Sequence, residues 1–173
     1  MLELRLALVG AFSKTQRSPG RYFVALWNNI AITVWLARPD GETAKASVSC
    51  AEELKRTYSK FSVLHIAEEG AGLPTSEGRE ELIAGARNNA RCVVCVGVLL
   101  PEGSVFANML RVFIRGVRTL LRGELNTVLE QDVVALARLV VEIHVRGTGV
   151  RIAANDLVAA IGEARRLAVA AAA

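Results

Sequence analysis

The sequence predicts an α/β domain with one mixed β-sheet of four to six strands, opened by a β-hairpin and covered by four or five helices. From residue 22 onward, apolar runs of strand length alternate with segments of helical periodicity, which implies parallel strand pairing with helices packed over the sheet. The length of 173 residues suits one domain. The composition, with 52% hydrophobic and 22% charged residues, is globular, and no linker or internal repeat divides residues 1–173.

The first 21 residues are expected to form an N-terminal extension of the domain. Residues 2–12 begin with alternating apolar and polar side chains, as an edge strand does, and residues 13–21 indicate a loop because they contain a Pro-Gly pair. Two apolar runs, residues 22–27 and 30–37, then flank Asn28 and Asn29. Asparagine tolerates the positive φ that a two-residue turn demands, so these runs predict the opening β-hairpin.

Helices and strands are expected to alternate after the hairpin. Ser49 and Glu52 have the spacing of a capping box, and Ser76 is a suitable N-cap. The apolar run from Cys92 to Leu100 predicts a central strand covered on both faces. The expected elements are a helix over about 49–60, a strand over 61–67, a helix over 76–90, a strand over 91–100 and a helix over 104–122.

The segment 124–146 is expected to be a helical insertion. Val133, Leu136 and Val140 keep helical spacing, which favours a helix over residues 126–146. The alternative is a hairpin of residues 139–145 and 150–153 around an Arg-Gly-Thr-Gly turn. With the helix, residues 149–153 form a short final strand, and Asn155 caps a last helix.

This order of elements resembles the STAS domain, which occurs in sulfate transporters and anti-sigma-factor antagonists, and here a divergent bacterial stand-alone branch of it. The likeness rests on the stretches 22–37, 61–67, 91–106 and 150–153 with the helix that follows. It implies a non-enzymatic regulatory module of bacterial signalling that binds a protein. In the antagonists, a phosphorylatable Ser or Thr begins the helix after the third strand. Thr75 and Ser76 occupy roughly that place, but the acidic residue that precedes it in the family is absent.

The sequence contains no recognisable catalytic constellation, so we expect no enzyme, metal or cofactor. Cys92 and Cys95 lie three apart on the expected strand, where side chains alternate between faces, so they are interpreted as two structural cysteines. His65 and His144 have no Cys, Asp or Glu at a ligand spacing, so both are interpreted as ordinary core or surface histidines. No nucleophile elbow or Walker motif is present.

A small-ligand or nucleotide site in the loop between the third strand and its helix is the alternative function. Gly70, Gly72, Thr75 and Ser76 follow a strand and begin a helix, an arrangement in which backbone N–H groups favour an anion. The same hydroxyls are candidates for phosphorylation, because the helix dipole favours negative charge at Ser76. An ordinary turn with an N-cap is the simpler explanation of these residues, because Glu68 and Glu69 lie close by and would repel a phosphate.

The most distinctive expected surface is a stripe of arginines on the helix 104–122. Arg111, Arg115, Arg118 and Arg122 fall within about 60° of one another at 100° per residue. Met109, Phe113, Val117 and Leu120 are expected to face the sheet instead. The stripe is either a solvated helix face or a docking surface for an acidic or phosphorylated protein or, as a further alternative, for anionic membrane lipids.

Charge and composition limit the remaining partners and the compartment. The net charge is only +4 and aromatic residues make up 5%, so nucleic acid is not an expected partner. Three cysteines without a disulfide spacing favour the cytoplasm. The longest apolar run is too short to span a membrane. A mean hydropathy of +0.34 is high for a soluble monomer and suggests a homo-oligomer.

Overall fold

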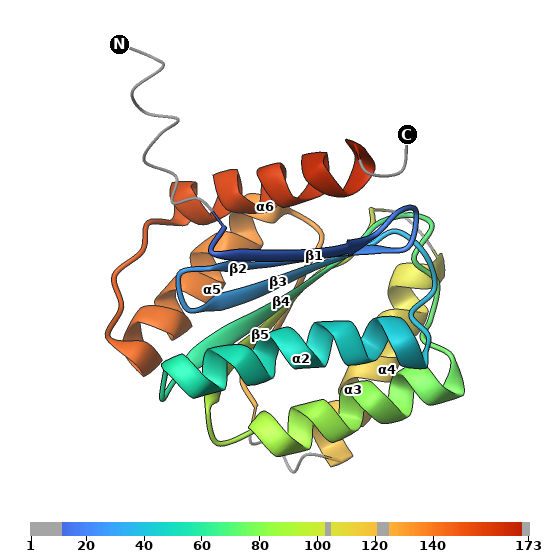
Figure 1. Cartoon of the computed structure of the whole chain (residues 1–173), viewed down its shortest axis with the longest axis horizontal. Coiled ribbons are helices and arrows are strands. Elements are labelled where there is room, and N and C mark those ends of the chain that lie inside the picture. Colours follow the sequence, from blue (N-terminus) through green and yellow to red (C-terminus); the bar gives the residue numbers. More distant parts are fainter. Residues whose placement is uncertain (1–11, 103–104, 121–124, 171–173) are drawn as a thin grey trace.

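The computed structural model describes residues 12–102, 105–120 and 125–170. The chain forms the expected α/β fold, in which one mixed β-sheet of six strands is enclosed by two layers of helices (Figure 1). The strands lie in the order β1-β2-β3-β4-β5-β6, with the first three antiparallel and the last four parallel. Their bounds are β1 Lys14–Ser18, β2 Tyr22–Trp27, β3 Ile30–Trp35, β4 Phe61–Ala67, β5 Val93–Leu99 and β6 Thr127–Glu130.

The opening hairpin is confirmed, and its turn depends on Asn28, whose φ is 51°. The neighbouring Asn29 side chain donates to the Lys60 carbonyl at 3.1 Å, which fastens the turn to the start of β4. The predicted loop over 13–21 is partly wrong, because β1 pairs with β2 along its whole length. Its side chains are mostly exposed and polar, so the sequence of β1 lacks the alternation of apolar residues that predicts a strand. Residues 1–11, where the edge strand was expected, lie outside the described residues.

In the described residues, five helices cover the sheet, and they lie three on one face and two on the other (Figure 1). The three that connect successive parallel strands share one face because right-handed crossovers that progress in one direction across a sheet must do so. The first face carries α2 Gly41–Thr57, α3 Ser76–Asn89 and α4 Val105–Leu120, and the other carries α5 Val133–Thr148 and α6 Ala154–Ala170.

Helix α2 begins about eight residues earlier than predicted. Its N-cap is Asp40, whose carboxylate accepts from the Thr43 N–H at 3.0 Å while the Thr43 hydroxyl accepts from the Asp40 N–H at 2.9 Å. This reciprocal cap uses threonine where the usual capping box has Glu or Gln. The sequence pattern of Ser49 and Glu52 therefore predicted the helix start at the wrong residue. Ser49 lies inside the helix.

The segment after α4 adds a strand to the sheet. Residues Thr127–Glu130 form β6, which pairs with β5 from Val96 to Leu99. The helical interpretation of the following residues is confirmed by α5, and Gly149 ends it in the left-handed conformation with a φ of 74°. No strand forms over 149–153, which connect α5 to α6. The sequence analysis placed the final strand over residues 149–153 and missed β6, because β6 has only four residues, is partly buried and leaves little apolar pattern.

Close packing of α2 on α3 depends on Gly85, so we predict that Gly85→Ala destabilises the fold. A Cβ at this position would lie 2.5 Å from a methyl carbon of Val48, and overpacking of this kind costs about 1–3 kcal/mol. Gly162→Ala is the matched control, because nothing lies within 4 Å of its Cβ position and alanine favours a helix by about 0.5–1 kcal/mol. Urea unfolding measures both changes. A Gly85→Ala protein as stable as Gly162→Ala would contradict the packing.

Candidate functional site

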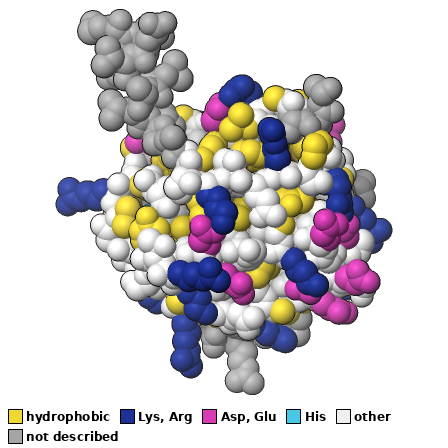
Figure 2. Space-filling view, in the orientation of Figure 1, with side chains coloured by type: hydrophobic (Ala, Val, Ile, Leu, Met, Phe, Trp, Pro, Cys, Tyr) yellow, Lys and Arg dark blue, Asp and Glu magenta, His cyan; other side chains and the backbone are white. Residues whose placement is uncertain are grey.

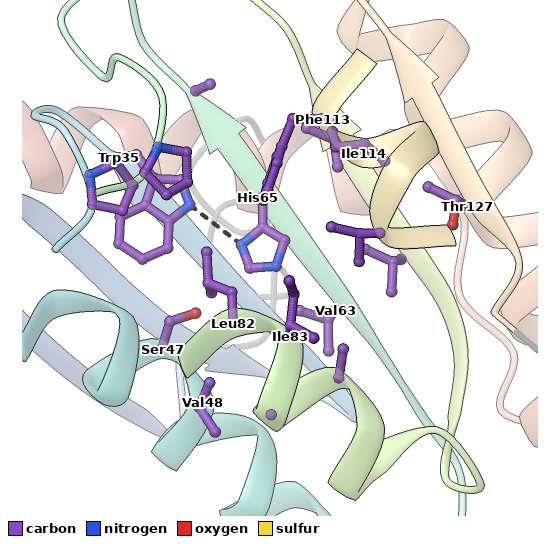
Figure 3. Close-up of a pocket in the computed structure, with 18 of the residues that line it drawn as sticks. Trp35, Ser47, Val48, Val63, His65, Leu82, Ile83, Phe113, Ile114 and Thr127 are labelled. Carbon is purple, nitrogen blue, oxygen red and sulfur yellow. Dashed lines mark hydrogen bonds between the residues drawn. The ribbon is translucent and has the colours of Figure 1, made fainter. Parts of the chain in front are cut away.

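The best candidate site is a cavity of about 160 Å³ between the sheet and helices α2, α3 and α4, here called the α4 cavity (Figure 3). Its floor is the sheet, its side walls are α2 and α3, and its remaining wall is α4. Most of the lining is apolar. The residues used below are Trp35, Ser47, Val63, His65, Gly72, Leu82, Ile83, Asn89, Val98, Leu110, Phe113, Ile114, Val117 and Thr127.

The regular periods of strand and helix place these side chains. Residues at alternate positions of a strand share a face, so Val63 and His65 both point from β4 toward the three helices. Leu110, Phe113, Ile114 and Val117 recur at helical spacing along α4 and form its inner side. The cavity therefore separates the inner side of α4 from the sheet, where dense packing is the usual arrangement.

Partly buried side chains border the cavity between α3 and α4. The facing side chains of the two helices, Leu82 and Ile83 on one and Phe113 and Ile114 on the other, are only partly buried. The Arg79 guanidinium carbon lies 5.9 Å from the centre of the Phe113 ring, a cation–π contact that bridges the two helices. The edge between α3 and α4 is therefore only partly shielded from solvent.

His65 is the distinctive polar group of the cavity. Its ring lies beside that of Trp35, with ring centres 6.0 Å apart, and the Trp35 Nε1–H donates to His65 Nδ1 at 3.3 Å (Figure 3). Surrounding apolar groups disfavour the imidazolium and lower the pKa of His65 to about 4. His65 is therefore neutral at pH 7, although the residue is only partly buried and lines the cavity.

The other polar side chains of the lining are engaged within the protein. The Ser47 and Thr33 hydroxyl oxygens lie 2.8 Å apart, and Thr127 donates to the Leu125 carbonyl at 3.4 Å. The Asn89 amide donates to the Gly85 carbonyl at 2.8 Å, whereas its Oδ1 is buried without a partner among the described residues. Among these polar side chains, His65 is therefore the one that is available to a ligand in the otherwise apolar cavity.

A second histidine takes part in an arrangement that resembles a hydrolytic triad. His144 Nδ1 lies 2.8 Å from the Ser62 hydroxyl and Nε2 lies 2.9 Å from Asn29 Oδ1. Ser62 and His144 are both 0% exposed, so no substrate reaches the hydroxyl in this conformation. Because Asn29 Oδ1 only accepts, Nε2 carries the proton and Nδ1 accepts from Ser62. Burial lowers the pKa of His144 to about 4, and the network attaches α5 to the sheet.

The predicted anion loop forms one end of the α4 cavity. Thr75, and not Ser76, is the N-cap, since its side chain accepts from the Gly78 N–H at 3.1 Å. Gly70 packs so closely that a Cβ would lie 2.6 Å from the Leu36 carbonyl oxygen, and Gly72 has a φ of 61° and lines the cavity. Ser76 is exposed. These roles explain both glycines by packing and turn geometry, and phosphorylation of Thr75 or Ser76 stays a prediction.

Two of the four arginines of the predicted stripe have described side chains. Arg115 is exposed, and Arg111 is half-buried and donates to Asn108 Oδ1 at 3.0 Å. The side chain of Arg118 and all of Arg122 lie outside the described residues. Docking by this stripe therefore stays a prediction.

The expected inner side of α4 is partly wrong. Met109 is 47% exposed and Val112 is 69% exposed, whereas Leu110 and Ile114 face inward beside Phe113 and Val117. Apolar residues occupy more than one face of this helix, so the pattern alone did not define which side is buried.

The cysteine pair is split across the sheet, as the strand interpretation predicted. Cys95 belongs to the core beneath α5 and α6, and Cys92 packs with the core on the opposite side. Burial raises the pKa of the Cys95 thiol to about 12, which opposes thiolate chemistry. Within the described ranges, no group of three or more His, Cys, Asp or Glu side chains is placed to hold a metal ion.

Comparison of the chain with protein-family models, curated proteins and solved structures gives no match. In the part of the chain that the structure describes, no helix is long and apolar enough to cross a membrane. The function must therefore be argued from the geometry of the chain itself.

Both buried histidines predict that stability falls on acidification. The unfolded chain takes up protons on histidine below about pH 6.5, whereas the folded protein does so only near pH 4. The unfolded state therefore binds more protons between these values, and each histidine removes roughly 2 kcal/mol of stability between pH 7 and pH 5. Urea unfolding at both pH values measures this loss. An unchanged free energy of unfolding, or NMR titration midpoints near 6.5, would contradict the burial of the two rings.

Proposed function

We propose that this protein is a non-enzymatic regulatory domain that binds a small, largely apolar molecule in the α4 cavity. The single observation that carries the proposal is the cavity itself, an apolar space of about 160 Å³ with one accessible polar edge. Pockets that combine apolar walls with a few polar groups are the usual sites for small molecules. The sequence analysis offered a ligand-sensing domain as an alternative and placed its site in the loop of Gly70 to Ser76. We now propose the α4 cavity, beside that loop, as the ligand site.

The size of the cavity supports a ligand about as large as benzene or somewhat larger. An engineered protein cavity of about 150 Å³ is known to bind benzene or xenon. An empty cavity leaves its lining without dispersion contacts and destabilises the fold. A ligand that restores these contacts stabilises the folded state by linkage.

The regulatory part of the proposal rests on α4, which forms one wall of the cavity. Its inner side contacts the space that a ligand would occupy, and its outer face carries Met109, Arg111, Val112 and Arg115. A ligand that changes how α4 packs therefore changes the surface that a partner meets. Such coupling requires a ligand that binds the two packings with different affinity.

A non-enzymatic role is proposed because the titratable groups near the core lack the arrangement of a reaction centre. Ser62 and His144 are sealed, and His65 is the titratable side chain that lines the cavity within the described residues. A general base acts on a proton of a bound substrate, often with a second group that orients it. The group that orients His65 is the Trp35 N–H, which donates to His65 Nδ1. This hydrogen bond makes Nδ1 a weaker base.

We predict that neutral aromatic probes raise the melting temperature and that filling the cavity abolishes this effect. Toluene is a suitable probe, because its ring matches the apolar lining. Ile114→Trp places a larger side chain in the cavity from α4, whereas Val112→Trp places the same side chain on the outer face of the helix, where Val112 is 69% exposed. Differential scanning calorimetry measures the shift, expected to be several degrees at saturation.

Two results would count against this proposal. One is an absence of any shift with toluene in the natural protein. The other is a shift that persists in Ile114→Trp and disappears in Val112→Trp, since binding would then occur on the outer face of α4.

A second candidate function is docking of a protein partner on the outer face of α4, as the STAS resemblance implies. It is favoured by the exposed apolar side chains Met109 and Val112, which share the outer face of α4 with the half-buried Arg111 and the exposed Arg115. Arginine, methionine and apolar groups in one patch are typical of protein interfaces. The partner surface would be acidic or phosphorylated, because Arg115 has no counter-charge among the described residues.

We predict that the double variant Arg111→Glu/Arg115→Glu loses partners that the natural protein captures from native lysate. Charge reversal replaces attraction by repulsion at an interface of this kind. Arg138→Glu on α5 is the control, because Arg138 is exposed on the other helical layer. Circular dichroism confirms that each variant is folded. Capture of the same proteins by the double variant would refute docking on this face.

A further inference from the structure

The α4 cavity contains a hydrogen-bond donor whose position in the ring of His65 is determined by Trp35. The Trp35 indole nitrogen can only donate, and it donates to His65 Nδ1 at 3.3 Å. A neutral imidazole that accepts at Nδ1 carries its proton on Nε2. No protein group among the described residues accepts from Nε2, which points away from Trp35 and into the cavity (Figure 3).

Other polar groups of the lining do not compete for this role. The Ser47 hydroxyl is buried against Thr33, and the Asn89 and Thr127 side chains donate to backbone carbonyls. The Trp35 N–H is used by His65. Among the described lining residues, the Nε2–H of His65 is therefore the directed donor that a ligand can reach, whereas the unpartnered Asn89 Oδ1 is a buried acceptor.

The cavity also disfavours a charged ligand. Among the residues that the structure describes, no Lys, Arg, Asp or Glu lines it. An unpaired charge that leaves water for an apolar site loses far more hydration energy than one neutral hydrogen bond returns. With its pKa lowered to about 4 by burial, His65 supplies no positive charge at neutral pH.

We propose that the α4 cavity selects small, neutral, predominantly apolar molecules that carry one hydrogen-bond acceptor, which accepts from His65 Nε2–H. This inference rests on the proposed function, ligand binding in the cavity, and adds the chemical class of the ligand. A carbonyl compound with an aromatic or aliphatic ring fits the description, because the ring replaces lost apolar contacts and the oxygen meets the donor. An apolar molecule of the same shape leaves the N–H without a partner.

Acetophenone and α-methylstyrene form a matched pair for the test, since they differ by a carbonyl oxygen in place of a methylene group. Dissociation constants for both are measured by amide NMR titration of the full chain at pH 7, with benzoate as the charged probe. We expect acetophenone to bind three- to tenfold more tightly than α-methylstyrene, the range that one net hydrogen bond provides. Benzoate is expected to bind more weakly than either.

His65→Phe removes the donor and keeps a flat ring beside Trp35. In this variant the two neutral probes are expected to bind equally. Because loss of the Trp35 partner could unfold the variant, nitrogen NMR of the His65 ring in the natural protein provides a second measurement. The Nε2–H resonance is expected to shift with acetophenone and to stay nearly unchanged with α-methylstyrene.

The outcomes separate this inference from the proposed function. Equal binding of both neutral probes by the natural protein, or tighter binding of benzoate, overturns the selection of a neutral acceptor and leaves ligand binding in the cavity intact. An Nε2 resonance without a proton overturns it as well. Failure of all three probes together with toluene overturns the proposed function itself.

Discussion

The proposed ligand site depends on the spacing between helix α4 and the sheet. On the opposite face, α5 packs so closely that a Cβ on Gly97 would lie 2.8 Å from a methyl carbon of Val140. On the α4 side, α2 and α3 are in close contact through Gly85, but the inner side chains of α4 reach the sheet across a cavity of about 160 Å³. Protein interiors are normally filled to the density of organic crystals. A space of this size beneath one helix therefore departs from the usual packing, and it is the feature on which the proposed ligand site rests.

The two histidines illustrate how one residue type serves structure in one place and recognition in another. His144 has both ring nitrogens bonded, to Ser62 and Asn29, and is fully buried, so the network that resembles a triad acts as a fastening between α5, β4 and the turn before β3. His65 has one ring nitrogen bonded, to Trp35, and is a partly buried residue of the cavity lining. Burial lowers the pKa of each to about 4, so both are neutral near pH 7. The difference lies in their hydrogen-bond partners, because a satisfied ring stabilises the fold and a half-satisfied ring is available to a ligand.

Sequence patterns were sufficient for the α/β class, the hairpin at Asn28 and the strand Phe61–Ala67, because these depend on local turn chemistry and on apolar runs of strand length. They did not predict β1, which is a polar edge strand, or the start of α2, where Thr43 replaces the expected Glu of a capping box.

The residues of the candidate site were harder to predict from the sequence than the fold was. His144 meets Asn29, which lies 115 residues earlier in the chain, and spacing within a sequence does not report such pairings. The α4 cavity was not foreseen, since it results from the distance between elements. The loop of Gly72 was expected to hold an anion, which stays a prediction, and in the structure Gly72 lines the cavity.

A crystal structure of the protein pressurised with xenon tests the central claim most directly, because xenon occupies apolar protein cavities and scatters strongly. The account predicts a xenon atom in the space bounded by Val63, Phe113 and Ile114, with α4 in the position described above. A structure in which the inner side chains of α4 contact the sheet directly, with no xenon between them, would contradict the existence of the cavity and with it the proposed ligand site.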